Sequence, residues 1–208
     1  MSENSFDEKA ATWDDDPGHV ERATEVARAI RGTLALDPSV RMLEYGAGTG
    51  LVSQALRNTV GPITMADSST GMRAVMQEKV AAGAITDARV WDLDLAAAPV
   101  DDTDERFDLI VTVLTLHHID APGPLLSSFA ALLADGGHLA IVDLDEEDGS
   151  FHPEGFAGHH GFAHAALTTD LEQAGFTDIA FGPCHEIIRD GRPYPLFLAT
   201  ASLSPAAT

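Results

Sequence analysis

The chain has 208 residues, of which 45% are hydrophobic, and its 33 acidic residues against 12 basic residues give a formal net charge of −21. A field of this sign repels phosphate groups, so nucleic acid and anionic membrane surfaces are disfavoured as partners. Cys184 is the only cysteine, which excludes an intrachain disulfide and a cysteine-based metal cluster. The length suits one domain, and no apolar run predicts a signal peptide or a membrane span, so we expect a cytoplasmic protein.

The first 35 residues predict two helices in a polar arm. Phe6, Ala10 and Trp13 are spaced by four and three residues, which places them on one face of a short helix. A second amphipathic helix is expected over residues 19–34. Large apolar side chains in a charged segment need a surface to pack against, so we expect this arm to contact the rest of the chain.

Between residues 40 and 145, strand-like and helix-like segments alternate, which is typical of a parallel sheet with right-handed crossovers. Residues 96–105, rich in Ala, Pro and Asp, are expected to form a surface loop. The expected strands cover 40–45, 62–67, 85–91, 107–113 and 137–144, and the expected helices cover 51–60, 69–83 and 122–134.

The final third of the chain changes in character. Residues 143–162 contain acids, glycines and histidines with little periodicity. A helix is expected over residues 164–174, and Gly175 fits the left-handed residue that follows many helices. The remaining expected elements are two strands, 176–188 and 194–203, joined as a hairpin by the turn-forming sequence RDGR.

The most informative motif lies in the first strand-to-helix turn. Gly46, Gly48 and Gly50 occupy every second position, and glycine permits positive φ values and a close approach of a ligand to the backbone. The GxGxG spacing differs from the GxGxxG of dinucleotide-binding loops, and the carboxylate of Glu44 disfavours an anionic ligand. The motif predicts a floor for a bound molecule, the alternative being an ordinary glycine-rich turn.

Asp67 ends the second expected strand, roughly 20 residues beyond the glycine-rich turn, where nucleotide-binding folds place an acid that accepts hydrogen bonds from ribose hydroxyl groups. The alternative is a helix-capping role, because Asp-Ser-Ser-Thr is rich in capping residues. Both roles are compatible if Ser68 or Ser69 caps the helix and Asp67 holds a ribose.

Four segments resemble, in order and spacing, the successive motifs of class I S-adenosylmethionine-dependent methyltransferases, with the ubiquinone-biosynthesis type of the small-molecule branch as the nearest: LEYGAGTG, MADSS, FDLIVTVLTLHHI and LLADGGHLAIVDLD. The resemblance implies an α/β fold with a Rossmann-like, seven-stranded, mostly parallel sheet, helices on both faces and an antiparallel last strand between the fifth and the sixth. It also implies S-adenosylmethionine as cofactor, S-adenosylhomocysteine as product and methyl transfer to a small-molecule acceptor.

On this resemblance, residues 1–208 form a single methyltransferase domain with three parts. Residues 1–35 would be a helical cap or lid over cofactor and acceptor, the alternative being that its aromatic residues pack on the outer face of the sheet. Residues 40–145 would form the cofactor-binding core. Residues 146–208 would hold an acceptor-pocket segment, the last helix and the C-terminal hairpin.

The cofactor contacts are expected at the carboxyl ends of the strands, where open α/β sheets bind ligands. The glycine-rich turn would lie under the methionine part, and Glu44 would organise that turn and favour nearby positive charge. Asp92 would accept a hydrogen bond from the adenine amino group beside Leu93, with Asp94 as a rival, and Leu114 would offer its backbone carbonyl. The predicted cofactor-binding residues are Glu44, Gly46, Ala47, Gly48, Gly50, Asp67, Ser68, Asp92, Leu93 and Leu114.

The segment after the fourth strand, Leu116-His117-His118, matches the family's position beside the transferred methyl group. His117 is a candidate general base because an imidazole titrates near neutral pH, although the family often carries His-His here as structural hydrogen-bonding groups. His160, from a histidine-rich segment further on, is the second catalytic candidate.

Residues 151–164 contain four histidines and three phenylalanines. Three interpretations stay open: an acceptor pocket, a loop docked by its phenylalanines, and a metal site. We predict no metal, because no cysteine lies nearby and the segment would have to fold tightly for its imidazoles to converge. The predicted substrate-pocket residues are Trp13, Leu116, His117, His159 and His160.

Two other functions stay open. A non-catalytic module that binds S-adenosylmethionine or S-adenosylhomocysteine also fits the sequence, because methyl transfer demands few catalytic groups. An NAD(P)-dependent oxidoreductase would share the parallel sheet and Asp67, but the glycine spacing and Glu44 count against it. The sequence allows a monomer or a homodimer.

Overall fold

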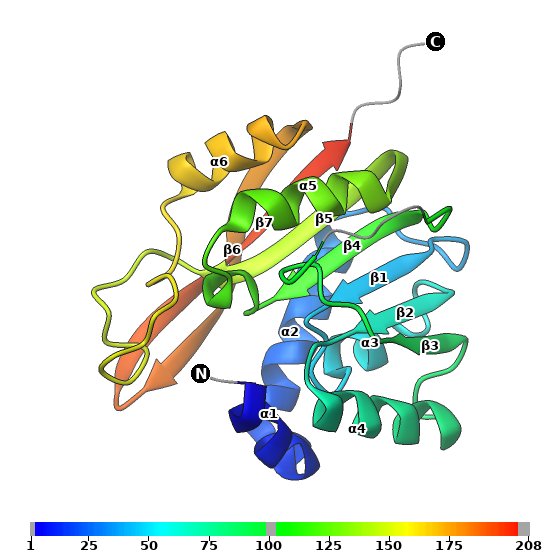
Figure 1. The fold of residues 1–208 in the computed structure, drawn as a ribbon, viewed down its shortest axis with the longest axis horizontal. Helices are drawn as coiled ribbons and strands as arrows, with labels where there is room; N and C mark the ends of the chain where they lie inside the picture. Colours follow the sequence, from blue (N-terminus) through cyan, green and yellow to red (C-terminus); the bar gives the residue numbers. More distant parts are fainter. Residues whose placement is uncertain (1–2, 99–102, 204–208) are drawn as a thin grey trace. The chain divides into compact units, whose positions relative to one another are not determined.

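The computed structural model describes residues 3–98 and 103–203, and its contacts divide the chain into two compact units, residues 1–94 and 95–208 (Figure 1). The middle of the predicted surface loop, residues 99–102, lies outside the described residues. The single domain expected from the sequence stays a prediction.

The first unit combines N-terminal helices with the first strands of the sheet. Its elements are α1 (Glu3–Lys9), the 3₁₀ helix η1 (Ala10–Asp15), α2 (Pro17–Thr33), β1 (Met42–Tyr45), α3 (Leu51–Leu56), β2 (Ile63–Ala66), α4 (Thr70–Ala81) and β3 (Ala88–Trp91). α2 begins at Pro17, because the side chain of Asp16 accepts a hydrogen bond from the N–H of Gly18 and proline is favoured in the first turn. All residues of β1 and β2 are buried, as in strands covered on both faces.

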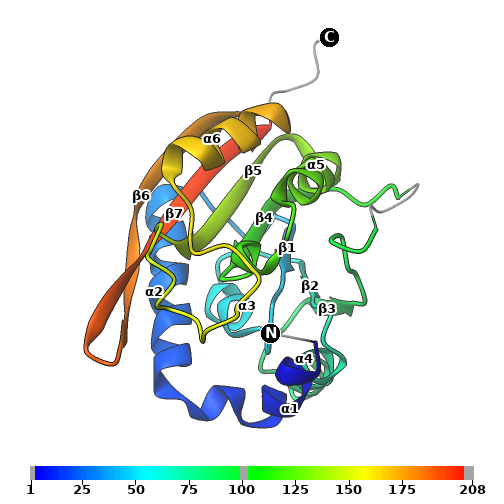
Figure 2. The ribbon, with the colours of Figure 1, turned by 60° about the vertical axis from the view of Figure 1, so that its left-hand side comes forward.

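Several elements of this unit are shorter than the sequence predicts, and a cause can be named for α3 and β3. α3 ends at Leu56, because Asn58 and Thr59 are poor helix formers. β3 starts only at Ala88, because Asp87 has a φ of +51°, which does not fit an extended strand. Figure 2 shows α1 beside α4, so the N-terminal arm packs on the helix that follows β2.

The second unit contains the remaining strands. Its elements are β4 (Phe107–Val113), the 3₁₀ helix η2 (Leu116–His118), α5 (Pro122–Leu132), β5 (Leu133–Leu144), α6 (His164–Gln173), β6 (Phe176–Arg189) and β7 (Arg192–Leu203). α5 and α6 pack against each other and lie over one face of these strands (Figure 1). β5 begins at Leu133, four residues earlier than expected, because Leu133 is extended and pairs with Phe107 of β4. The left-handed Gly175 after α6, with a φ of +94°, is confirmed, as is the hairpin turn between β6 and β7.

The strands follow the order β3-β2-β1-β4-β5-β7-β6. The pairs β1–β2, β2–β3 and β4–β5 are parallel, whereas β7 runs antiparallel to both β5 and β6. The predicted seven-stranded, mostly parallel sheet with an inserted antiparallel last strand is confirmed. Because parallel strands end at the same edge, β1, β2 and β3 bring their carboxyl ends together in the first unit, and β4 and β5 do so in the second.

A long connection, residues 145–163, joins β5 to α6, and we call it the β5–α6 loop. Its two ends are held together, because Asp145 and Phe162 form a bridge and the N–H of Glu147 donates to the carbonyl of His160 at 2.9 Å. Gly161 permits this pairing: its φ is +72°, and a Cβ there would lie 2.1 Å from the carbonyl oxygen of Asp145. The loop is therefore tied to the end of β5.

Candidate active site

The glycine-rich turn between β1 and α3 is left-handed at all three glycines. Gly46, Gly48 and Gly50 have φ values of +69°, +56° and +78°, which explains why glycine recurs at every second residue. A Cβ on Gly50 would lie 2.8 Å from Sδ of Met65, so Gly50 is required for packing. A Cβ on Gly48 would meet nothing within 4 Å, so open space lies over this residue. Gly48 is the point at which the turn can accept a ligand.

Glu44, in β1 just before the turn, is only 3% exposed. Its carboxylate accepts hydrogen bonds from the N–H of Ser53, at 2.9 Å, and from the hydroxyl of Ser53. Ser53 lies in the first turn of α3, where the N-cap residue Gly50 has no side chain, so Glu44 acts as the capping group. Burial raises the pKa of Glu44 to about 7, although both hydrogen bonds lower it. Glu44 therefore holds the start of α3, and its contact with a cofactor stays a prediction.

Asp67 connects the end of β2 to the glycine-rich turn. One carboxylate oxygen accepts the N–H of Gly48 at 2.7 Å, and the other accepts the N–H of Ser69 at 2.8 Å. Burial raises the pKa of Asp67, while these two hydrogen bonds lower it. Ser69 caps α4, since its hydroxyl accepts the N–H of Met72 at 3.1 Å. Because Ser69 supplies the cap, Asp67 is left to hold the turn, with lone pairs available to a ligand.

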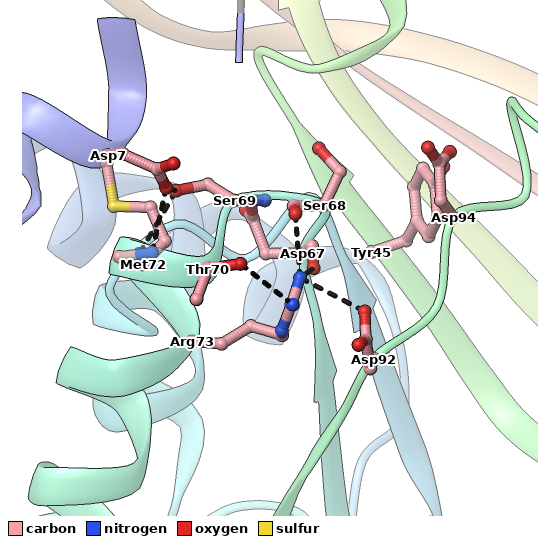
Figure 3. A network of polar contacts seen from close by, with 11 residues as sticks. Asp7, Tyr45, Asp67, Ser68, Ser69, Thr70, Met72, Arg73, Asp92 and Asp94 are labelled. Atoms are coloured by element: carbon pink, nitrogen blue, oxygen red, sulfur yellow. Dashed lines mark hydrogen bonds and ion pairs between the residues drawn. The ribbon is translucent and has the colours of Figure 1, made fainter. Parts of the chain in front are cut away.

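Arg73, which the sequence did not single out, joins the ends of β2 and β3 (Figure 3). One guanidinium nitrogen donates to the carbonyls of Asp67 and Ser68, each at 2.7 Å, and lies 3.1 Å from Oδ1 of Asp92. The side chain of Asp92 is 78% exposed. Arg73 therefore fixes two predicted cofactor residues, Ser68 and Asp92, relative to Asp67. The only feature of the sequence that could have indicated this role of Arg73 is its position in the first turn of the helix after β2.

The two candidates for the adenine contact differ in their surroundings. Asp92 pairs with Arg73, whereas Oδ1 of Asp94 lies 3.4 Å from the hydroxyl of Tyr45 and its side chain is half-buried (Figure 3). Leu93 between them is buried. Both acids lie at the carboxyl end of β3, so the alternative between Asp92 and Asp94 stays open.

The N-terminal arm attaches to this site through two carboxylates. Asp7 accepts the hydroxyl proton of Ser69 at 2.5 Å, and this bond is the main cause of its lowered pKa. Asp14 accepts the hydroxyl proton of Thr49 at 2.5 Å and lies 2.5 Å from Nζ of Lys79. The arm is thus bound to the glycine-rich turn and to the start of α4. The sequence did not indicate either contact.

Trp13, predicted to line the acceptor pocket, lies within this arm. Its ring stacks on His19 with centroids 4.2 Å apart, and Phe6 lies at 6.2 Å. Nδ1 of His19 is 2.8 Å from the carbonyl oxygen of Trp13. These aromatic residues pack against each other, and their role as a lid stays a prediction.

In the second unit, His117 forms a buried pair with Asp143, a residue that the sequence did not single out. Nδ1 of His117 lies 2.6 Å from Oδ1 of Asp143, and the backbone N–H of His117 donates to Oδ2 at 3.3 Å. The two residues are 2% and 0% exposed. Among the described residues, Nε2 of His117 makes no hydrogen bond. The Asp-Leu-Asp sequence at the end of β5 was the available signal for Asp143.

The two leucines predicted near the reaction centre are placed differently. Leu114 follows β4 with a φ of +51°, unusual for a residue other than glycine, and its N–H donates to the carbonyl of Val142 at 2.8 Å. Strained residues of this kind cluster at functional sites. Leu116 is fully buried, which makes it part of the core of the second unit.

The two histidines expected in the acceptor pocket make different contacts. Nε2 of His159 is 3.0 Å from the carbonyl oxygen of Ile119, and its N–H donates to the carbonyl of His117 at 2.8 Å, so His159 anchors the β5–α6 loop to η2. His160 has a side chain that is 45% exposed, with Nδ1 3.4 Å from Oε1 of Glu147. The structure therefore does not bring His160 into hydrogen-bond contact with His117.

His152, named by the sequence only as one of several histidines, lies close to His117. The ring centroids of His152 and His117 are 5.0 Å apart, and Phe156 stacks on His152 at 3.7 Å. Burial lowers the pKa of His118 to about 3 and that of His152 to about 4. Both imidazoles are therefore neutral at physiological pH.

Two further expectations for the β5–α6 loop concern metal and packing. Over residues 3–98 and 103–203, no group of three or more His, Cys, Asp or Glu side chains could hold a metal ion. Phe162 is buried, whereas Phe151 and Phe156 are half-buried. The metal-free protein stays a prediction for elemental analysis.

A family model described as a methyltransferase domain matches residues 18–180. The chain belongs to this family. The resemblance to class I S-adenosylmethionine-dependent methyltransferases is thereby confirmed. The match does not distinguish the small-molecule branch.

Among curated proteins, this chain is similar to the hybrid PKS-NRPS synthetase lepA of Aspergillus flavus, with 31% identity over 128 residues. The aligned region covers 59% of this chain and 3% of lepA. The chain spans only 3%, 24% and 53% of the first three curated relatives that it matches. The activity of the whole protein is therefore a matter for proposal.

Two solved structures share the fold of this methyltransferase-family chain. A Haloferax volcanii protein solved in complex with the Trm112 methyltransferase activator has a TM-score of 0.76 at 18% identity, over 96% of this chain and 97% of the other. The N-methyltransferase NodS of Bradyrhizobium japonicum, solved with S-adenosylhomocysteine, has a TM-score of 0.72 at 21% identity, over 96% and 97%. At these identities, the likeness establishes the fold. In the described residues, no helix is long and apolar enough to cross a membrane.

Proposed function

We propose that the protein transfers the methyl group of S-adenosylmethionine to a small-molecule acceptor. The observation that carries this proposal is the open space at Gly48 beside the carboxylate of Asp67, which accepts the N–H of Gly48 at 2.7 Å. The residues fit this cofactor, because the turn has a free glycine face and each oxygen of Asp67 retains a lone pair for a ribose hydroxyl. The neighbour in fold that was solved with S-adenosylhomocysteine adds support.

The remaining cofactor contacts are proposed on the same basis. Glu44 holds the start of α3, which follows the glycine-rich turn, and Arg73 holds the carbonyl of Asp67 at the end of β2. We propose the adenine contact for one of the two acids that follow β3. Asp92 is paired with Arg73, and Asp94 lies near the hydroxyl of Tyr45. The other proposed contacts are Gly46, Ala47, Gly50, Ser68, Leu93 and Leu114.

When bound, S-adenosylmethionine supplies an electrophilic methyl group on a sulfonium sulfur. The protein has to hold the acceptor in line with the carbon–sulfur bond and exclude water, and such positioning is worth about 7–11 kcal/mol in favourable cases. Of the two histidines predicted to be catalytic, we propose His117 as general base. Because the N–H at Nδ1 of His117 donates a hydrogen bond to the carboxylate of Asp143, the lone pair on Nε2 can take a proton from the acceptor. His160 is more exposed and is proposed only to line the acceptor pocket.

Calorimetry with S-adenosylhomocysteine tests the cofactor site. Gly48→Val should abolish binding, because the new side chain fills the open space over the turn and strains a left-handed residue. Gly83→Val is the matched control, since Gly83 also has a positive φ, +72°, and nothing within 4 Å of its Cβ position. Unchanged affinity in a folded Gly48→Val protein would show that the ligand binds elsewhere.

The acceptor is sought by mass spectrometry of small molecules methylated in a cell extract. A methylated product supports the proposal. Tight cofactor binding without any product across several extracts would favour the non-catalytic binding module. A monomer and a homodimer both satisfy the proposed function.

A further inference from the structure

Four rings lie together within the second unit, and we call them the imidazole cluster: His117, His118, His152 and Phe156. His117 and His118 have ring centroids 4.1 Å apart, and His118 and His152 lie at 5.6 Å. Phe156 stacks on His152 at 3.7 Å with an interplanar angle of 17°. η2 contributes two of these rings and the β5–α6 loop the other two.

His152 has a buried nitrogen that the protein leaves without a partner. The residue is 8% exposed, and within the described part of the chain no group makes a hydrogen bond to its Nε2. A buried polar group without a hydrogen bond is costly, and native proteins keep few of them. Nε2 of His152 is therefore a site at which a ligand atom would restore a hydrogen bond.

His117 presents a second free nitrogen in the same cluster. A carboxylate can only accept, so Nδ1 of His117 carries the proton that faces Asp143 at 2.6 Å. In an imidazole ring that carries a single proton, Nε2 is then the nitrogen with the lone pair. A buried pair of this kind suits chemistry in which the acceptor must lose a proton.

The charge of the cluster restricts the ligand further. The imidazoles of His118 and His152 are neutral, because burial lowers the pKa of each well below its ordinary value. The nearby guanidinium of Arg189 donates to the carbonyl of Phe151. The cluster itself thus offers flat rings and neutral nitrogens, which suit a planar uncharged molecule better than a carboxylate or phosphate.

We propose that the imidazole cluster binds the acceptor and that the acceptor is a neutral planar molecule with a hydroxyl group on unsaturated carbon, a phenol or an enol. This inference rests on the proposed methyl transfer. Nε2 of His152 makes a hydrogen bond to the acceptor, and the hydroxyl gives its proton to Nε2 of His117. The oxygen, or the enol carbon conjugated with it, bonds to the methyl carbon, while the carbon–sulfur bond breaks and its electron pair stays on sulfur.

The alternative ligand is an amine. Oε1 of Glu147 is buried and makes no hydrogen bond with any described residue, and Nδ1 of His160 lies 3.4 Å from it. An ammonium group would be attracted to that carboxylate rather than to the neutral rings. Methyl transfer to nitrogen is therefore the result that would contradict the imidazole cluster as acceptor site.

The first test uses S-adenosylmethionine labelled with ¹³C at the methyl group and the small-molecule fraction of a cell extract. The ¹³C shift of the product shows which atom received the methyl group. Methyl on oxygen or carbon supports the inference. Methyl on nitrogen or sulfur overturns it and leaves the proposed function intact, whereas a product absent from every extract counts against the proposed function.

The second test does not depend on finding the acceptor. Phenol and benzylamine are titrated into the S-adenosylhomocysteine-bound protein while the imidazole signals are followed by ¹⁵N NMR. Phenol should shift the signals of His117 and His152, and benzylamine should leave them in place. A phenol titration without effect on either ring, or a larger effect of benzylamine, overturns the inference even if methyl transfer is real.

His152→Phe removes the free nitrogen and keeps a ring to stack on Phe156. It should lose the phenol-induced shift at His117 and raise KM for the acceptor by about tenfold, the effect of one hydrogen bond, with unchanged affinity for S-adenosylhomocysteine. His185→Phe, on β6 and outside the cluster, should behave like the wild type. If His152→Phe fails to fold, His152→Gln replaces it. An unaltered KM in the folded variant contradicts the proposed role of His152.

Discussion

Substitution of Glu44 by glutamine isolates the effect of one buried acid on stability. Glu44 is 3% exposed and accepts two hydrogen bonds from Ser53, one of them from the N–H at 2.9 Å. Glutamine has nearly the same shape and keeps an acceptor oxygen for that N–H, but it cannot ionise. The variant therefore removes the charge and leaves the packing and the cap of α3 in place.

The magnitude follows from the rise in the pKa of Glu44 from 4.5 to about 7, which burial causes. At about 1.4 kcal/mol for each pKa unit, this rise corresponds to roughly 3 kcal/mol. Below pH 4.5, Glu44 is protonated in both the folded and the unfolded chain, so its contribution to stability is fully present. As the pH rises towards about 7, the unfolded chain ionises first, and this contribution is lost.

Urea denaturation of the wild type and Glu44→Gln between about pH 5 and about pH 8 measures this effect. The free energy of unfolding of the variant should gain roughly 3 kcal/mol relative to the wild type over this range. Glu78→Gln, at an exposed position of α4, is the control and should show no such trend. A difference between Glu44→Gln and the wild type that does not change with pH would refute the reasoning, because it would mean that Glu44 ionises normally in the folded protein.

Three further predictions concern contacts between distant segments. Asp14→Asn weakens the attachment of the N-terminal arm and should lower the free energy of unfolding by about 1–3 kcal/mol in urea denaturation. Gly71→Ala places a Cβ 2.9 Å from backbone atoms of Asp7 and should speed amide hydrogen exchange in α1. Gly161→Ala places a Cβ 2.1 Å from the carbonyl oxygen of Asp145 and should make the β5–α6 loop sensitive to proteolysis, measured by mass spectrometry of the fragments.

Gly83→Ala serves as the control for both glycine variants, since its Cβ would meet nothing within 4 Å. Exchange in α1 that is equal in Gly71→Ala and Gly83→Ala would show that the arm is not held at Gly71. A Gly161→Ala protein as resistant to proteolysis as the wild type would show that the two ends of the loop separate without consequence. For Asp14→Asn, an unchanged free energy of unfolding would mean that its ion pair with Lys79 contributes nothing measurable.

Local features of this protein follow from its sequence alone, because they depend on residues that are neighbours in the chain. Alternation of strand and helix between residues 40 and 145 predicts the parallel sheet, and the turn-forming RDGR predicts the final hairpin. The glycine spacing predicts the left-handed turn, since the backbone has a positive φ at all three positions and only glycine adopts such a φ without strain. The position of Asp67 at a strand end places its carboxylate beside that turn for the same topological reason.

Element boundaries were less predictable where one residue decides them. Asp87 has a left-handed φ and delays β3, and aspartate gives no sign of this in a strand-like run. β5 begins at Leu133, directly after the last residue of α5, because Leu133 pairs with Phe107 of β4. In both cases, propensity yields to a conformation that the surrounding structure imposes.

The tertiary structure alone decided which polar groups meet. Asp143 and His117 are 26 residues apart and Asp7 and Ser69 are 62 apart, so no local spacing relates them. Such pairs depend on which strand ends lie side by side and on where a loop or an arm returns to the sheet. Hydrophobic periodicity determines the buried face of an element, but it carries no information about the partner of a polar side chain. The free nitrogen of His152 belongs to the same class, because only the packing of the β5–α6 loop takes it out of water without giving it a hydrogen bond.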